Sequence, residues 1–188
     1  PIMEANKYSV TFNANGGTDL NFESKTVTYD QKYDDLPSVS RIGYTFAGWY
    51  TSASGGNKIT SETMVKITSN QVLYAHWNAN TYTISFNANG GSSLSQSSKT
   101  VTYDSTYGTL ATVSRTGYNF VGWFTVSTAT GGTQIKDTTK VQITSAQTLY
   151  ARWQAVDYTV TFDANGGKWA DDSETQEIVE TYDANYQL

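Results

Sequence analysis

Three short stretches of the sequence carry side-chain oxygens at a spacing that could ligate a cation. They are residues 13–17, 87–91 and 163–167, and each reads Asx-Ala-Asn-Gly-Gly. A calcium loop also needs several carboxylates and a later bidentate Glu, which these stretches lack. The Asn-Gly pair equally supplies the positive φ of a tight turn. The spacing therefore favours a chain reversal at the end of a strand, and we expect no metal and no cofactor.

A second set of candidates is charged. Three charged side chains recur in matching places, namely Lys25 and Lys99, Asp30 and Asp104, and Arg41 and Arg115. One Lys-Asp pair per repeat could form a buried isopeptide bond, which an intact mass would reveal as the loss of a water or an ammonia. The alternative is an exposed ion pair, worth about 0–1 kcal/mol. The sequence alone leaves both open and favours the ion pair.

The sequence argues against an enzyme. Its only histidine, His76, is replaced by Arg152 in the second copy of the repeat. A catalytic repeat would need the same reactive groups twice, or one composite site. We therefore expect no enzyme activity and no catalytic residue.

An aromatic stretch organises the chain. Residues 43–50 read Gly-Tyr-Thr-Phe-Ala-Gly-Trp-Tyr and return with small changes as residues 117–124. Strand alternation places Tyr44, Phe46 and Tyr50 on one face and Trp49 on the other. Gly48 marks a bulge or a close backbone approach, and we expect it to let the indole turn inward. A ligand-stacking platform is one interpretation, but a central core strand is favoured, because small domains depend on a few large aromatics.

The repetition sets the domain organisation. We predict a lead-in at 1–7, a repeat domain at 8–77, a linker at 78–81, a second repeat domain at 82–153, a linker at 154–157 and a truncated third repeat at 158–188. The third copy ends before any aromatic stretch, so it should lack a complete core. We expect the chain to be a fragment of something longer.

Each repeat has the same order of expected elements. In the first repeat, residues 8–12, 25–30, 44–50 and 73–77 alternate apolar and polar side chains, as strands do. Tyr33, Leu36 and Val39 are spaced three apart, which suits a short helix or 3₁₀ turn across the sheet. The order predicts an α+β, β-rich ββαββ domain.

Composition excludes several classes. The chain has 188 residues, no cysteine, a net charge of −5 and a pI near 4.7. Disulfides are absent, and the negative charge disfavours nucleic acid. No apolar run approaches the ~20 residues of a membrane span, so we expect no membrane insertion.

The combined pattern of NGG turn, GYxFxGW stretch and terminal xAxW resembles the Listeria–Bacteroides repeat, the B-repeat family of internalin-type bacterial surface proteins. It covers nearly the whole chain. The resemblance implies a β-grasp-like fold, a sheet wrapped on a short helix. It also implies an exported, extracellular location at the cell surface or cell wall.

Two functions remain. The first is a non-catalytic stalk or spacer that presents a distal adhesin or host-binding domain, with neighbouring repeats of the same chain as partners. The alternative is that the repeats bind a host protein or glycan through exposed aromatics such as Tyr74, Tyr118 or Tyr150. Linkers of four residues without Gly or Pro span at most about 14 Å, which suits closely spaced repeats.

Overall fold

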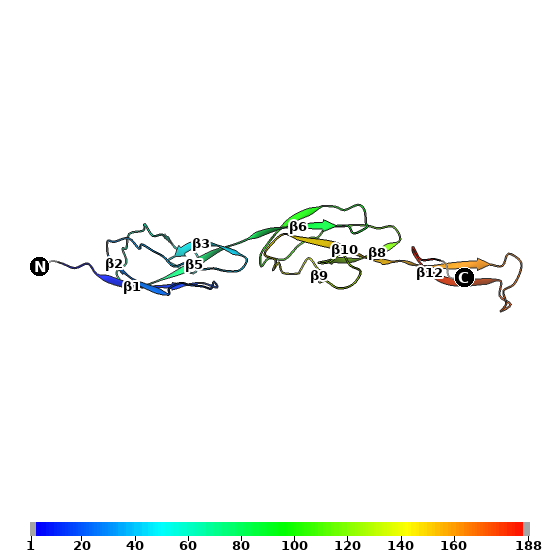
Figure 1. Cartoon of the computed structure of the whole chain (residues 1–188), viewed down its shortest axis with the longest axis horizontal. Helices are drawn as coiled ribbons and strands as arrows, with labels where there is room; N and C mark the ends of the chain where they lie inside the picture. The colour runs from blue at the N-terminus through cyan, green and yellow to red at the C-terminus, as the bar shows by residue number, and fades with distance from the viewer. Residues whose placement is uncertain (1–2, 186–188) are drawn as a thin grey trace. The chain divides into compact units, whose positions relative to one another are not determined.

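The computed structural model describes residues 3–185 and shows an all-β chain in which Figure 1 draws strands and no helix. The predicted α+β class and the β-grasp-like ββαββ order are therefore wrong. Residues 1–2 and 186–188, at the ends of the predicted lead-in and third repeat, lie outside the described residues.

The first repeat forms one five-stranded sheet and the second repeat forms another. The first has the order β2-β1-β5-β3-β4 and comprises β1 (Lys7–Asn13), β2 (Ser24–Thr28), β3 (Tyr44–Tyr50), β4 (Lys58–Ile59) and β5 (Gln71–Ala79). The second has the order β7-β6-β10-β8-β9 and comprises β6 (Thr81–Asn87), β7 (Ser98–Thr102), β8 (Tyr118–Phe124), β9 (Gln134–Ile135) and β10 (Gln147–Ala155). A two-stranded sheet follows, made of β11 (Asp157–Asp163) and β12 (Thr175–Thr181).

Strand β1 lies between two partners of opposite direction. It pairs antiparallel with β2 and parallel with β5, the last strand of the same repeat. Phe12 faces Leu73 in the parallel register. Strand β6 pairs in parallel with β10 in the same way. The first and last strands of each repeat are therefore neighbours.

The inward-facing side chains of each sheet form a separate core. In the first repeat the buried set is Val10, Phe12, Val27, Tyr33, Trp49, Ile59, Val65, Leu73 and Ala75. The indoles are at the centre, since Trp49 is 1% exposed and Trp123 is 2% exposed. The interpretation of the aromatic stretch as a core strand is confirmed.

A bulge at Gly48 decides which aromatic side chains meet the core. The register of β3 against β5 shifts between Phe46 and Gly48, whose φ is +137°. The extra residue brings the rings of Phe46 and Trp49 to 5.5 Å in an edge-to-face contact. Of the two alternatives for Gly48, the structure shows the bulge. Phe46, however, lies on the side of Trp49 and not on the side of Tyr50.

The segment predicted as a helix is an irregular stretch, because side chains take the carbonyls that a helix would use. The ammonium of Lys25 donates to the carbonyls of Tyr33 and Asp35, at 2.5 and 2.7 Å. The indole of Trp49 donates to the carbonyl of Pro37 at 3.0 Å. In a helix each amide donates to the carbonyl four residues earlier, whereas here the amides of Tyr33 and Asp34 donate to the carbonyls of Thr63 and Ser61, at 2.9 and 3.0 Å.

The described chain divides into two compact units. Unit 1 holds the first repeat up to Thr81 together with Thr102–Asp104 and Gln142–Thr144, and unit 2 holds the remainder. Residues 157–185 pair as the β11–β12 hairpin, and none of them is buried. This agrees with the expectation that the third copy lacks a complete core, whereas the exact domain boundaries stay a prediction.

Candidate functional site

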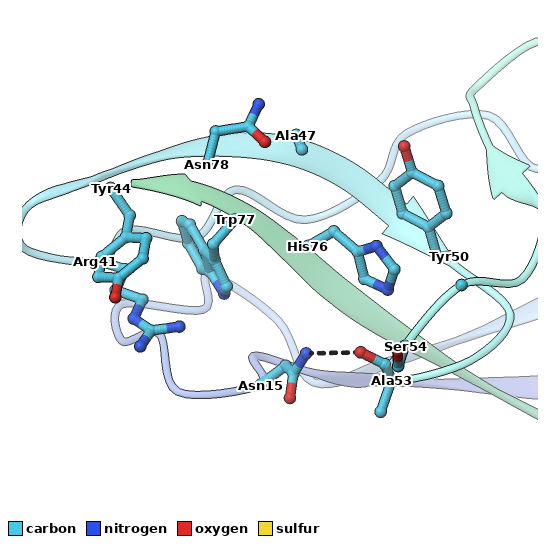
Figure 2. Close-up of a pocket in the computed structure, with 11 residues that line it drawn as sticks. Asn15, Arg41, Tyr44, Ala47, Tyr50, Ala53, Ser54, His76, Trp77 and Asn78 are labelled. Atoms are coloured by element: carbon cyan, nitrogen blue, oxygen red, sulfur yellow. Dashed lines mark hydrogen bonds between the residues drawn. The ribbon is translucent and has the colours of Figure 1, made fainter. Parts of the chain in front are cut away.

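A surface hollow of about 370 Å³ on the first repeat is a candidate site, because aromatic and polar side chains line it together. Figure 2 shows the side chains that line it, which come from the ends of β3 and β5 and from the turns beside them. Six of them could contact a ligand, namely Asn15, Arg41, Tyr44, Tyr50, His76 and Trp77. The set combines aromatic rings, one guanidinium and one amide.

A tyrosine and a histidine form one wall of the hollow (Figure 2). The rings of Tyr50 and His76 are stacked, with centroids 4.0 Å apart and planes within 9°. The Nε2 atom of His76 lies 2.8 Å from the carbonyl oxygen of Ser52, which can only accept, so this nitrogen carries the proton. The imidazole is thereby held flat against the phenol ring as a stacking surface.

The second repeat builds this wall differently. Arg152, which replaces His76, lies with its guanidinium carbon 3.5 Å from the ring centroid of Phe124. Its Nη2 atom donates to the carbonyls of Thr128 and Gly131, at 3.2 and 2.6 Å. A ring and a planar polar group thus stack in both repeats, but the exposed chemistry differs.

The Asx-Ala-Asn-Gly-Gly turn borders the hollow and is a structural turn. Asn15 has a φ of +49°. Its side-chain amide nitrogen donates to the carbonyls of Ala53 and Ala75, at 3.2 and 2.9 Å. The backbone amide of Asn15 donates to the side-chain oxygen of Asn13 at 2.8 Å. The predicted chain reversal is confirmed, and its Asn also fastens the turn to β5.

The other copies of the turn show how this depends on a complete repeat. Asn89 donates to the carbonyls of Ser127 and Ala151, at 3.0 and 2.9 Å. Asn165 keeps only the local bond from its backbone amide to Asp163, at 2.7 Å. Across residues 3–185, no group of His, Asp or Glu side chains is arranged to hold a metal ion.

The recurring Lys and Asp side chains serve separate contacts. The ammonium of Lys25 contacts two backbone carbonyls, while Asp30 forms an ion pair with Lys66. Lys99 contacts the carbonyls of Tyr107 and Thr109 in the same manner, at 2.7 and 2.9 Å. Lys25 therefore holds the irregular segment in place by hydrogen bonds to its carbonyls. The Asp30–Lys66 ion pair is exposed and therefore weak.

The tyrosines proposed as ligand contacts are all half-buried. Tyr74 lies opposite Tyr50 on the neighbouring strand, and Tyr150 lies opposite Phe124. Such cross-strand pairs stabilise a sheet. Tyr118 is engaged more firmly, through the contact described next.

A further arrangement, which the sequence analysis missed, lies within unit 1. The hydroxyl of Tyr44 donates to Oδ2 of Asp104 at 2.7 Å, and its ring meets that of Tyr103 edge-to-face at 5.6 Å. The guanidinium carbon of Arg41 lies 3.9 Å from the ring centroid of Tyr44. The hydrogen bond to the Asp104 carboxylate raises the pKa of Tyr44. We call this contact, between an Arg-x-Gly-Tyr loop and a Tyr-Asp turn, the clasp.

Unit 2 contains a second clasp with nearly the same geometry. The hydroxyl of Tyr118 donates to Oδ2 of Asp183 at 2.9 Å, and the rings of Tyr118 and Tyr182 are 5.6 Å apart. The guanidinium carbon of Arg115 lies 3.7 Å from the Tyr118 ring centroid. The sequence carries a signal for the clasp. Arg-x-Gly-Tyr occurs at 41–44 and 115–118, and Thr-Tyr-Asp occurs at 28–30, 102–104 and 181–183.

Glycine is required inside the clasp for two reasons. Gly43 has a φ of +77°, and a Cβ placed on it would lie 2.3 Å from the ring of Tyr103. Gly117 has a φ of +76° and would meet Tyr182 at the same distance. Real Cβ atoms do not approach other atoms so closely, so the loop carries a residue without a side chain.

Backbone hydrogen bonds run beside each clasp through one linker residue. The amide of Asn80 donates to the carbonyl of Gly43, and its carbonyl accepts from the amide of Tyr103, both at 2.9 Å. Val156 makes the matching pair of bonds, with Gly117 and Tyr182. The linkers at 78–81 and 154–157 are therefore held at these residues by main-chain bonds.

Comparison with known sequences agrees with this threefold pattern. The Listeria–Bacteroides repeat domain matches residues 8–76, 82–152 and 158–187. The chain belongs to the Listeria–Bacteroides repeat family. Repeats of this family occur in bacterial surface proteins such as internalins.

Three relatives are similar to most of the chain. Internalin H of Listeria monocytogenes is 30% identical over 81% of the chain, and the match covers 26% of that protein. Two proteins of Evansella cellulosilytica, described as a Gly-rich membrane protein and a membrane protein, are each 31% identical over 92% of the chain. The matches cover 19% and 25% of those proteins, so the chain spans about a quarter or less of its relatives. Within residues 3–185, the structure contains no helix of the length and hydropathy that a membrane crossing needs.

Proposed function

We propose that the chain is a non-catalytic spacer segment of a bacterial cell-surface protein, which presents a distal adhesin or host-binding domain outside the cell. The observation that carries the proposal is the clasp. It adds hydrogen bonds and ring contacts to the covalent linker wherever a Tyr-Asp turn follows an Arg-x-Gly-Tyr loop. A spacer needs such support, because contacts beside the linker keep successive repeats from folding back on each other.

The interior of the repeats also supports a mechanical and not a chemical role. No polar or charged residue is buried among the described residues. Catalytic groups are commonly polar side chains held in a desolvated site, where their pKa values can be tuned. His76 sits in an open hollow, with Nε2 already bound to a carbonyl.

Small-angle scattering of chains with increasing numbers of repeats tests the proposal. A repeat of about 70 residues has an expected radius of gyration near 11 Å, so each added repeat should lengthen the maximum dimension by about 30 Å. Disrupting the clasp, as in Asp104→Asn, should reduce that increment. A maximum dimension that stays constant as repeats are added would contradict the spacer.

A second function is supported by the hollow of Figure 2. The stacked pair of Tyr50 and His76, next to Arg41 and Trp77, offers aromatic faces and a cation at one place on the surface. Exposed aromatic and Arg side chains are enriched at binding interfaces. The candidate ligand is a host glycan or protein.

A glycan array probed with the whole chain tests this second function. Tyr50→Ala should abolish binding, because it removes the stacking wall of the hollow. Phe124→Ala is the matched control, since it alters the equivalent ring of the second repeat. If Tyr50→Ala leaves binding unchanged, the hollow is not the site.

A further inference from the structure

The Tyr-Asp turn of the clasp has three copies, each preceded by Thr, at residues 29–30, 103–104 and 182–183. Among residues 3–185, only two of these copies hold a loop. Asp30, Asp104 and Asp183 have φ values of +63°, +62° and +62°, so the three turns share one left-handed backbone conformation. Asp104 and Asp183 each accept a hydrogen bond from a tyrosine of the preceding repeat. No Arg-x-Gly-Tyr loop among residues 3–185 contacts Tyr29 or Asp30.

The backbone around Tyr29 already has the geometry of an occupied clasp. The amide of Tyr29 donates to the carbonyl of Asn6 at 2.8 Å. In the two occupied turns, the amides of Tyr103 and Tyr182 donate to the linker residues Asn80 and Val156, each at 2.9 Å. Asn6 therefore takes the place of a linker residue between two repeats.

The side chains of this turn are arranged for the same contact. The ammonium of Lys66 donates to Oδ1 of Asp30. In the same way, the side-chain amide of Gln142 donates to Oδ1 of Asp104, at 2.5 Å. In Asp104 the other oxygen, Oδ2, accepts the phenol of Tyr44. The Lys66 ammonium also lies 5.3 Å from the ring centroid of Tyr29. The corresponding Oδ2 atom of Asp30 is thus presented beside a tyrosine ring held in place.

We propose that Tyr29 and Asp30 form a docking surface for the Arg-x-Gly-Tyr loop of a further Listeria–Bacteroides repeat, joined N-terminal to Asn6. The loop's tyrosine donates to Oδ2 of Asp30, and its glycine lies against the ring of Tyr29. Both loops of the described chain, at 41–44 and 115–118, already hold a turn, so a separate copy of this chain has no free loop to offer. The proposal stands whether or not the chain acts as a spacer.

The test uses residues 6–188 preceded by a second copy of residues 8–79, which is joined directly to Asn6 in place of residues 1–5. The amide of Asn6 then occupies the position of the Asn80 amide, which donates to the Gly43 carbonyl. We expect its hydrogen exchange, followed by NMR, to slow at least tenfold relative to the unextended chain. Asp30→Asn should restore fast exchange, whereas Asp34→Asn, an exposed Asp with a φ of +52° outside any clasp, should not.

Two further variants keep the test decisive. Gly43→Ala in the added copy alone should prevent the slowing, because its Cβ would strike the ring of Tyr29, while Gly55→Ala in that copy should not. Asp104→Asn in the unextended chain should accelerate hydrogen exchange of the Asn80 amide. The size of that change measures how much an occupied clasp protects a linker amide. If Asn80 responds to Asp104→Asn but Asn6 stays unprotected in a folded extended chain, the docking surface is disproved. If Asp104→Asn leaves the exchange rate of the Asn80 amide unchanged, an occupied clasp does not protect the linker amide, and the proposal fails as well.

Discussion

The hydroxyl of Tyr44 lies 2.7 Å from the carboxylate of Asp104, although 60 positions separate the two residues in sequence. Tyr118 and Asp183 repeat the contact across 65 positions, at 2.9 Å. Each bond joins the aromatic strand of one repeat to the turn that follows the second strand of the next. A substitution in the turn should therefore change the stability of the repeat that precedes it in the chain.

Gly43 and Gly55 form a matched pair for measuring the clasp. Both have left-handed φ values, +77° and +72°, so Ala costs about 1 kcal/mol of backbone strain at either position. Only at Gly43 would the new methyl group strike Tyr103, whereas Gly55 has open space. We expect Gly43→Ala to lower the free energy of unfolding by about 1–3 kcal/mol more than Gly55→Ala, in urea titrations. Adding Tyr103→Ala should remove most of that difference, and an unchanged difference would rule out the ring as its cause.

The clasp should weaken at high pH. The hydrogen bond to Asp104 raises the pKa of Tyr44, because the neutral phenol donates to the carboxylate. The folded pKa then lies above the unfolded value of about 10, so this stabilisation is complete below pH ~10 and is lost as the pH rises through the folded pKa. NMR titration of labelled tyrosines should show a lower midpoint for Tyr44 in Asp104→Asn. The Tyr118 midpoint, which Asp183 raises, should stay unchanged in that variant.

Trp49 should be essential to the first repeat. Its side chain is 1% exposed, its indole donates to Pro37, and its ring meets Phe12 at 5.0 Å. Replacing it by Ala should cost about 3–5 kcal/mol, against a total of about 4–10 kcal/mol for a 70-residue unit. Calorimetry should show the transition of the first repeat lost or strongly lowered. Trp169→Ala, at a 38% exposed position, is the control and should change stability by less than about 0.5 kcal/mol.

Asn15 should stabilise the chain through its side chain, independently of calcium. Asn15 and Asn165 share a φ of +49°, but only Asn15 donates from its amide to two carbonyls. Asn15→Ala should therefore lower the free energy of unfolding by about 1–3 kcal/mol more than Asn165→Ala. Added calcium should leave the melting temperature of either variant and of the parent chain unchanged. A calcium-dependent rise that Asn15→Ala removes would restore the cation-loop interpretation.

Much of the strand structure could be predicted from the residues. The alternating stretches at 8–12, 44–50 and 73–77 fall within β1, β3 and β5, because a period of two follows directly from strand geometry. The period identifies the buried face of a strand but not its neighbours. The parallel pairing of β1 with β5 joins segments about sixty residues apart, and no local pattern contains it.

The failed helix prediction has a specific cause. Tyr33, Leu36 and Val39 are spaced as on a short helix, but Lys25 and Trp49 bind the carbonyls of that segment. Those two side chains arrive from other strands, so the competition is visible only in three dimensions. Local spacing was overridden by tertiary hydrogen bonds.

The candidate sites, too, could be predicted only in their local patterns and not in their tertiary contacts. His76 and Tyr50 come from different strands, and their stacking depends on the register of β3 against β5. The clasp left a sequence trace in its recurring Gly43 and Gly117, yet the reason for the glycine is a ring that belongs to the next repeat. Repetition can mark such residues, but their partners come from the fold.

The parallel neighbours β1 and β5 also determine how a repeat would bear load. A pull applied to the start of β1 and the end of β5 slides the two strands along each other, so their hydrogen bonds are strained together and not opened one at a time. Stretching experiments on single molecules should accordingly find higher rupture forces for the two complete repeats than for the β11–β12 hairpin, whose antiparallel ends separate like a zipper. A segment tethered at both ends under fluid drag would hold its folded length by this arrangement.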